Sequence, residues 1–220
     1  MGVSYLVGCR FDTSIAKEMA CAYPDRIERH RKKKLIICQG SNTEGYYYIV
    51  LEGEVKISGI SPDGKNFTLF VCVAPSIFGE TAFINDIREF YAEALTDVTL
   101  LKLNISDTFP SSSLETKFLR ELVKVACAKD YTKRKIVQPH RNISLKKILL
   151  NILEDLSRSD SKYSKKTERN GRLCVELDYT QQSIAEFAQA SRVNVSKTLM
   201  ELAQEGIIDT DKRKIYYYIS

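Results

Sequence analysis

The residues with the clearest potential for chemistry lie between Leu177 and Ile208, where short polar and cationic side chains fall on two predicted helices. Thr180 and Ser191 fit N-cap positions, and apolar residues recur behind each at helical spacing. The segment from Arg192 to Lys197 opens the second helix with a guanidinium, an amide, a hydroxyl and an ammonium group. Such groups on the first turns of a helix suit base edges in the DNA major groove and the neighbouring phosphates.

Individual contacts follow from the hydrogen-bonding groups of these side chains. Arg192 suits guanine O6 and N7 or a phosphate, Asn194 suits adenine, and Val193 suits the methyl group of thymine. Ser191 belongs to the same DNA-binding set. Contacts to phosphates, which fix the register of the protein on the duplex, are expected from Thr180, Gln182, Ser196, Lys197, Lys212 and Arg213.

The sequence TQQSIAEFAQASRVNVSKTLMELAQEGII resembles the winged helix-turn-helix of the CRP/FNR family of bacterial transcription regulators, whose recognition helix commonly reads S-R-x-x-V-S-[RK] before L-x-x-L. Gln39-Gly40, Leu51 to Val55 and Phe78-Gly79-Glu80 resemble the cyclic-nucleotide-binding β-roll of that family. The resemblance runs from about Arg26 to the C-terminus. It implies a sequence-specific DNA-binding transcription regulator that acts as a homodimer, with RNA polymerase as a further partner if it activates.

The resemblance also bears on the target sequence. Many relatives have a Glu, which accepts from cytosine, where this chain has Val and Asn, so we expect half-sites richer in A·T. For a symmetric dimer the half-sites should lie about 34 Å apart.

The expected fold class is α+β. Apolar runs cut by glycine turns between Arg26 and Leu103 predict an antiparallel, jelly-roll-like barrel. We assign residues 1–110 to a cyclic-nucleotide-binding-like effector domain, 111–138 to a dimerisation helix and hinge, and 139–220 to a winged helix-turn-helix domain. Pro139 would end the long helix and mark the hinge. The wing would be a hairpin with Lys212 and Arg213 at its tip.

The predicted effector site departs from the pattern of the members that bind cyclic AMP. Those members carry an Arg-Ser or Arg-Thr pair about ten residues after the F-G-E loop, where this chain has Phe90 and Tyr91. Arg88 lies two residues earlier and could substitute if the loop is shifted. The candidate effector-binding residues are Gly79, Glu80, Arg88, Phe90, Tyr91 and Lys129.

These residues suit a smaller, more apolar anion such as an aromatic acid. The halorespiration regulators, which sense chlorinated aromatic acids, also lack the Arg-Ser pair and carry a Val-x-Val-Ser sequence like residues 193–196. Two alternatives stay open: a cyclic-nucleotide-responsive regulator, and a constitutive one in which Phe90 and Tyr91 merely fill the barrel. No other cofactor is expected.

The segment from Ser113 to Val137 has the spacing of a coiled-coil seam, which would pair two copies of the chain. The predicted seam consists of Phe118, Leu122, Val125, Lys129, Thr132 and Ile136. Lys129 and Thr132 interrupt it, either as a register-setting polar pair or as contacts to the effector.

Composition excludes several other classes of protein. With 220 residues, 44% of them hydrophobic and 28% charged, and a net charge of +5, the chain should be a globular protein that permits nucleic-acid binding. Neither a membrane helix nor a signal peptide is predicted, so we expect a cytoplasmic protein. Neither His30 nor His140 lies beside residues that could complete a catalytic triad, and the sequence has no P-loop motif. An enzyme is therefore not expected. A non-DNA interaction module is the remaining competitor.

Six cysteines without a C-x-x-C pair predict neither disulfides nor a zinc site, and most should be core residues. The gap between Cys9 and Cys21 argues against an iron-sulfur cluster.

Two further segments are expected to be exposed to solvent. The basic run from Arg29 to Lys34 is interpreted as a solvated turn or strand edge. The segment from Ser157 to Arg172 is interpreted as a solvated loop, before a short strand from Cys174 to Leu177.

Overall fold

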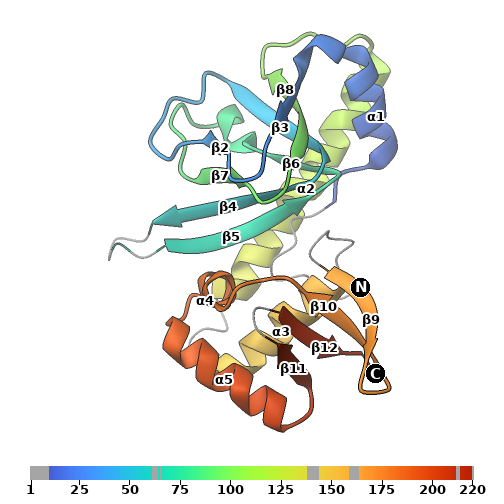
Figure 1. Cartoon of the computed structure of the whole chain (residues 1–220). Coiled ribbons are helices and arrows are strands. Elements are labelled where there is room, and N and C mark those ends of the chain that lie inside the picture. Colours follow the sequence, from blue (N-terminus) through green and yellow to red (C-terminus); the bar gives the residue numbers. More distant parts are fainter. Residues whose placement is uncertain are drawn as a thin grey trace.

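The computed structural model of the chain describes residues 10–60, 64, 66–137, 144–158, 164–211 and 214–219, and for residues 131–137 only the backbone. Figure 1 shows an N-terminal barrel of strands, two helices along it, and a smaller C-terminal unit below. The two helices are α1 (Thr13–Ala22) and α2 (Ser112–Val137). We call the barrel the β-roll and the C-terminal unit the head. The predicted α+β fold is confirmed.

The β-roll consists of two four-stranded antiparallel sheets, with the strand orders β1-β8-β3-β6 and β2-β7-β4-β5. The strands are β1 (Ile27–His30), β2 (Leu35–Ile37), β3 (Tyr46–Glu52), β4 (Glu54–Ile60), β5 (Asn66–Val73), β6 (Ser76–Phe78), β7 (Tyr91–Ala94) and β8 (Val98–Asn104). Two 3-10 helices accompany them, η1 (Pro24–Arg26) and η2 (Glu80–Phe83). As predicted, the basic run falls at the end of β1 and in the exposed turn before β2.

The strand β3 is buried on both of its faces. Because successive side chains of a strand point to opposite sides, Tyr48 and Val50 pack inside the β-roll, whereas Tyr47 and Ile49 pack outside against α1 and α2. All four are less than 9% exposed. The two helices therefore form a cover that the outer face of this sheet requires.

The helix α2 covers the β-roll with the face that was predicted to form the dimer seam. Phe118 is fully buried, and its ring centroid lies 5.8 Å from that of Tyr47. Val125 is buried in the same cluster, and Leu122 packs against it. The prediction that Phe118, Leu122 and Val125 form the dimer interface is therefore wrong. The apolar period marks the face of α2 that packs on β3 of the same chain.

Of the remaining seam residues, only Lys129 has a described side chain. Lys129 is also buried against the β-roll, so it does not interrupt a seam. The side chains of Thr132 and Ile136 lie outside the described residues, as does Pro139.

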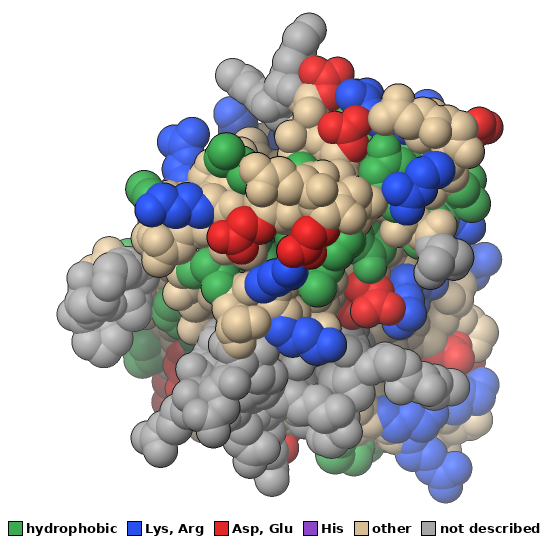
Figure 2. Space-filling model, turned by 90° about the horizontal axis from the view of Figure 1, so that it is seen from below, with side chains coloured by type: hydrophobic (Ala, Val, Ile, Leu, Met, Phe, Trp, Pro, Cys, Tyr) green, Lys and Arg blue, Asp and Glu red, His purple; other side chains and the backbone are tan. Residues whose placement is uncertain are grey.

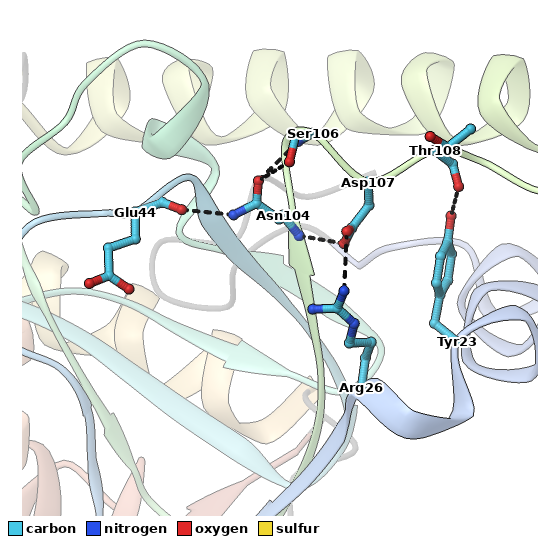
Figure 3. Close-up of polar contacts among 7 residues, drawn as sticks. All are labelled: Tyr23, Arg26, Glu44, Asn104, Ser106, Asp107 and Thr108. Atoms are coloured by element: carbon cyan, nitrogen blue, oxygen red, sulfur yellow. Dashed lines mark hydrogen bonds and ion pairs between the residues drawn. The ribbon is translucent and has the colours of Figure 1, made fainter.

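A network of hydrogen bonds fixes the loop between β8 and α2 (Figure 3). The backbone N–H of Asn104 donates to Asp107 Oδ2 at 2.7 Å, and Asn104 Nδ2 donates to the carbonyl of Glu44 at 2.7 Å. The hydroxyl of Tyr23, just after α1, donates to the carbonyl of Thr108 at 2.7 Å. Burial raises the pKa of Tyr23 above its ordinary value. The start of α2 is thus tied to both α1 and the roll.

The head contains three helices and a four-stranded sheet in the order β11-β12-β10-β9. Its elements are α3 (Leu145–Arg158), β9 (Ser164–Arg169), β10 (Arg172–Leu177), α4 (Gln181–Ala188), α5 (Arg192–Gln204), β11 (Ile208–Asp211) and β12 (Lys214–Tyr218). Fully buried Leu149, Leu153 and Val195 stand at the centre of its core.

The strand β9 corrects the prediction of a solvated loop from Ser157 to Arg172. It pairs with β10 along its whole length, through a turn at Asn170 and Gly171 with φ angles of 54° and 70°. An Asn-Gly turn with positive φ favours a hairpin. Because β9 is an edge strand rich in charged side chains, its composition resembled that of a loop.

The head shares a core with the β-roll. Val71 and Val73 on β5 pack among the buried residues of the head. On the adjacent strand, Lys56 Nζ lies 3.6 Å from Glu93 of β7 and 3.6 Å from Glu186 of α4. The hairpin of β4 and β5 is therefore the part of the roll on which the head rests.

The cysteines are less buried than predicted. Among the described residues, Cys72 and Cys174 are buried, but Cys21, Cys38 and Cys127 are exposed, so the prediction that most are core residues is wrong. Cys9 lies outside the described residues. None of the described helices is both long and apolar enough to cross a membrane.

We expect Phe118→Ala to lower the free energy of unfolding by about 3–5 kcal/mol, because it leaves a cavity between α2 and β3. Lys117→Ala, which removes an exposed ion pair with Glu18, should cost no more than about 1 kcal/mol. Denaturant unfolding at a fixed protein concentration measures both. Loss of dimerisation by Phe118→Ala without loss of stability would contradict this placement of α2.

Candidate nucleic-acid interface and effector pocket

Two side-chain caps set the geometry of the helix-turn-helix. Thr180 Oγ1 accepts from the backbone N–H of Ser183 at 3.0 Å, and Ser191 Oγ accepts from that of Asn194 at 3.2 Å. Gln189 takes a left-handed conformation, with φ of 49°, between α4 and α5. Both predicted N-caps are confirmed. Each cap fixes the residue at which its helix begins, so α5 begins at Arg192.

The start of α5 presents the predicted base-reading side chains to solvent. Val195 and Leu199 are buried in the head, which fixes the rotation of the helix. Arg192, Val193 and Asn194 are exposed, and Val193 is 64% exposed although it is apolar. An exposed apolar side chain between two hydrogen-bonding ones is suited to contact with a thymine methyl group.

The other predicted contacts are arranged around this helix start. Lys197 lies exposed one turn later, and Ser196 is partly buried beside it. Gln182 is exposed on α4, where its Nε2 donates to Glu186 at 3.3 Å. The wing residues Lys212 and Arg213 lie outside the described residues.

One exposed residue of α5 was missed in the sequence. Met200 is 62% exposed and lies two turns after Val193 and one after Lys197. The sequence alone does not reveal this exposure, because methionine occurs both in cores and on surfaces that bind partners. The structure reveals it by showing which face of α5 is buried.

Figure 2, the view from below, shows a surface of mixed charge. Lys and Arg side chains are spread over this face, and Asp and Glu side chains lie between them. The described residues on this face therefore form no single continuous basic patch. The positions of individual side chains on α5 carry the argument for DNA binding.

A pocket that is partly open to solvent lies inside the β-roll, and the space free of atoms within and at the mouth of it is about 450 Å³. Its apolar wall comes from β2, β4, β5 and the end of β6. The lining residues are Ile37, Ile57, Leu69, Phe70, Phe78, Gly79, Glu80, Thr81, Arg88, Glu89, Phe90, Tyr91 and Ala92. Five of the six predicted effector residues are therefore brought together here. The wall residues of β2, β4 and β5 were missed, because strand patterns do not reveal which strands face one cavity.

Arg88 is the central charge of this cavity. It is 5% exposed, and its guanidinium donates to the carbonyls of Gly79 (3.2 Å), Thr43 (3.0 Å) and Tyr46 (2.5 Å). Burial lowers the pKa of Arg88, since desolvation disfavours the charged form. A guanidinium has more N–H donors than these three carbonyls accept. Its hydrogen-bond acceptors are neutral carbonyls, and the carboxylate of Glu44 also acts on its charge.

Gly79 makes this placement of Arg88 possible. A Cβ at Gly79 would lie 3.1 Å from Arg88 Nη1, and the backbone there has a φ of +79°. Glycine adopts this conformation without strain, whereas other residues rarely do.

Lys129 does not line the cavity but holds its rim. Its Nζ lies 2.6 Å from Glu80 Oε1 and 2.8 Å from the carbonyl of Ile77, and it sits 5.2 Å from the ring centroid of Phe70. The ammonium group therefore joins α2 to the loop that carries Glu80. Of the two alternatives for Lys129, a polar pair between two copies of the chain does not fit this buried position.

The opposite face of α2 is exposed and apolar. Leu119 is 44% exposed and Val123 is 61% exposed, and the exposed residues Ala126 and Cys127 follow them at helical spacing. Lone exposed apolar residues are common, but a stripe along a helix is a candidate surface for a partner.

Comparison with known proteins gave family models for both halves of the chain. The model "Cyclic nucleotide-binding domain" matches residues 27–109, and "Crp-like helix-turn-helix domain" matches residues 147–218. The transcriptional regulator SdrP of Thermus thermophilus is 30% identical over 168 residues, which cover 76% of this chain and 77% of that protein.

Solved structures share the fold. A crystal structure of a CRP-family transcriptional regulator from Thermus thermophilus gives a TM-score of 0.72 at 23% identity, over 87% of this chain and 92% of that one. The c-di-GMP responsive regulator CLP of Xanthomonas campestris gives 0.78 at 17% identity, over 95% and 100%.

The exposed stripe on α2 yields a test of association. We expect Val123→Glu to weaken self-association at least tenfold, because it would bury a charge in an apolar contact between two copies. Ser113→Glu, in the first turn of α2, where a carboxylate suits the helix dipole, should leave association unchanged. Sedimentation at several protein concentrations measures both. A Val123→Glu protein that associates like the unaltered chain would show that this stripe is not the interface.

Proposed function

Because the chain belongs to the CRP/FNR family of transcription regulators, we propose that it binds double-stranded DNA as a homodimer under the control of a small effector in the β-roll. Its proposed place of action is the cytoplasm, where bacterial DNA lies. RNA polymerase is a further partner if the outcome is activation. Its function is regulatory and not enzymatic, in keeping with relatives that are transcription regulators.

The single observation that carries DNA binding is the exposed start of α5. Arg192, Val193 and Asn194 stand on the first turn of a capped helix whose other face is locked into the head. This geometry lets a helix enter the major groove with its N-terminal residues on base edges. Lys197, with Thr180 and Gln182 on α4, would contact phosphates.

The proposed dimer forms through the outer face of α2. Leu119, Val123, Ala126 and Cys127 are the exposed side chains that two copies of α2 would cover around a two-fold axis. The inner face of the helix is unavailable, because it already packs on β3. This places the heads on either side of the axis, as a palindromic site requires.

The proposed effector is a small, mainly apolar molecule with one acidic group. Phe70, Phe90 and Tyr91 supply an aromatic surface, against which a flat ring can pack. Arg88 supplies a buried cation whose partners are backbone carbonyls. A buried cation whose hydrogen bonds go to neutral carbonyls favours an anion beside it.

Regulation is proposed to pass through the hairpin of β4 and β5, which forms a wall between cavity and head. Phe70 lines the cavity, whereas its neighbour Val71 packs into the head core. Ile57 and its neighbour Lys56 repeat this arrangement on β4. An effector controls DNA affinity only by its difference in affinity for two arrangements of the head.

We expect Arg192→Ala to weaken binding of a selected duplex by about 1–3 kcal/mol and to relax its sequence preference. Lys197→Ala should weaken binding to all duplexes alike and reduce the salt slope of affinity by about one. Fluorescence anisotropy at several salt concentrations measures these effects. Selection from a random pool should also return A·T-rich half-sites.

Arg158→Ala is the matched control, because Arg158 ends α3, is exposed, and forms an ion pair with Glu154 one turn earlier in the same helix. It should retain the affinity of the unaltered protein. Equal affinity of all these variants for the duplex would contradict the assignment of α5 as the reading helix.

For the effector, we expect small aromatic carboxylates, but not their uncharged amides or cyclic AMP, to raise the thermal stability of the protein. At a hundredfold excess over Kd the gain in stability should be about 2.7 kcal/mol. Arg88→Gln should abolish this gain, whereas Glu89→Gln at the cavity rim should keep it. Stabilisation by cyclic AMP alone would support the cyclic-nucleotide alternative, and a lack of response to every compound would favour a constitutive regulator.

A further inference from the structure

The strand β11, the first strand of the hairpin that is proposed to be the wing, carries two carboxylates. Asp209 and Asp211 are 31% and 50% exposed at their side chains. A carboxylate near a phosphate is repelled, and several such contacts would weaken binding. The strand therefore needs a counter-charge if it is to approach the duplex.

Arg169, at the end of β9, supplies that counter-charge from the far edge of the sheet. Its Nε donates to Asp209 Oδ2 at 2.5 Å, and its Nη1 lies 3.8 Å from Asp211 Oδ2. The guanidinium also lies 4.3 Å from the ring centroid of Tyr216 on β12. One side chain thus contacts residues of two other strands.

The neighbouring basic side chains of this sheet also contact other strands or loops of the head. Lys214 on β12 lies 2.6 Å from Glu176 on β10, and Arg172 sits over the ring of Tyr218 while it donates to the carbonyl of Gly206. The hydrogen bond from Arg169 lowers the pKa of Asp209 below its ordinary value, because it stabilises the ionised carboxylate.

We propose that Arg169 is a positioning residue for DNA binding, which neutralises Asp209 and Asp211 and holds the wing strand where phosphates can approach it. This inference rests on the proposed DNA-binding function. Arg169 itself makes no base contact. Its stacking on Tyr216 fixes the guanidinium in one plane, which a lysine would not reproduce.

The test measures affinity for a duplex of about 30 base pairs, long enough for two half-sites one helical turn apart, selected by the unaltered protein from a random pool. Arg169→Gln should weaken binding about tenfold, and Arg169→Lys, which keeps the charge, about threefold. Arg158→Gln serves as the control for removal of an exposed arginine from the head. Thermal unfolding of each variant shows whether the head stays folded.

A second set of variants tests whether Arg169 acts by neutralising the two carboxylates or only by stabilising the head. Addition of Asp209→Asn and Asp211→Asn to Arg169→Gln should restore the affinity to within about threefold of the unaltered protein, because no carboxylate is then left to repel phosphates. A triple variant as weak as Arg169→Gln would overturn the proposal, and so would an Arg169→Gln variant that binds normally. If the unaltered protein bound no duplex, the proposed function itself would fail instead.

Discussion

Strands with two buried faces are the constraint on which this molecule is built. In a strand such as β3, where successive apolar side chains point to opposite faces, both faces have to be covered, from outside as well as from within. The sheet that contains β3 is covered by α1 and α2, and the hairpin of β4 and β5 is partly covered by the head. The sensor and the DNA-binding unit are therefore joined by burial of surface and not by the chain connection alone.

This constraint explains how one short strand can serve two purposes. In β5 the side chain of Phe70 belongs to the cavity and that of Val71 to the head, and they are neighbours in sequence. A rigid interior transmits a displacement of one face to the other, since close-packed cores do not absorb it. The helix α2 also has two faces with different contacts. Its inner face holds Lys129 beside the cavity, and its outer face exposes Val123 to the proposed second copy of the chain.

Local features of the fold could be predicted from the sequence, because local chemistry determines them. The N-caps at Thr180 and Ser191 and the buried stripe of α5 required only residues a few positions apart. The Asn170-Gly171 sequence is also a local signal for a hairpin turn, but the loop prediction followed the charged composition of β9. The face of α2 was misassigned, because periodicity shows which side of a helix is buried and not what buries it.

Features formed by residues distant in sequence could not be predicted in this way. Arg88 was selected for its spacing from Glu80, yet the carbonyls of Thr43 and Tyr46 that hold it come from more than 40 residues away. Glu80 itself is held by Lys129, 49 residues later in the chain. Such partners follow from the strand order, which no single segment of the sequence contains.

The pairing of Gly79 with Arg88 also limits how this pocket can evolve. Any side chain at residue 79 would strain the backbone and would press on the guanidinium, which would have to shift by a few tenths of an ångström. A lineage that acquired a larger residue at 79 would therefore be favoured to change residue 88 as well. Mutational drift at these two positions is expected to be coupled.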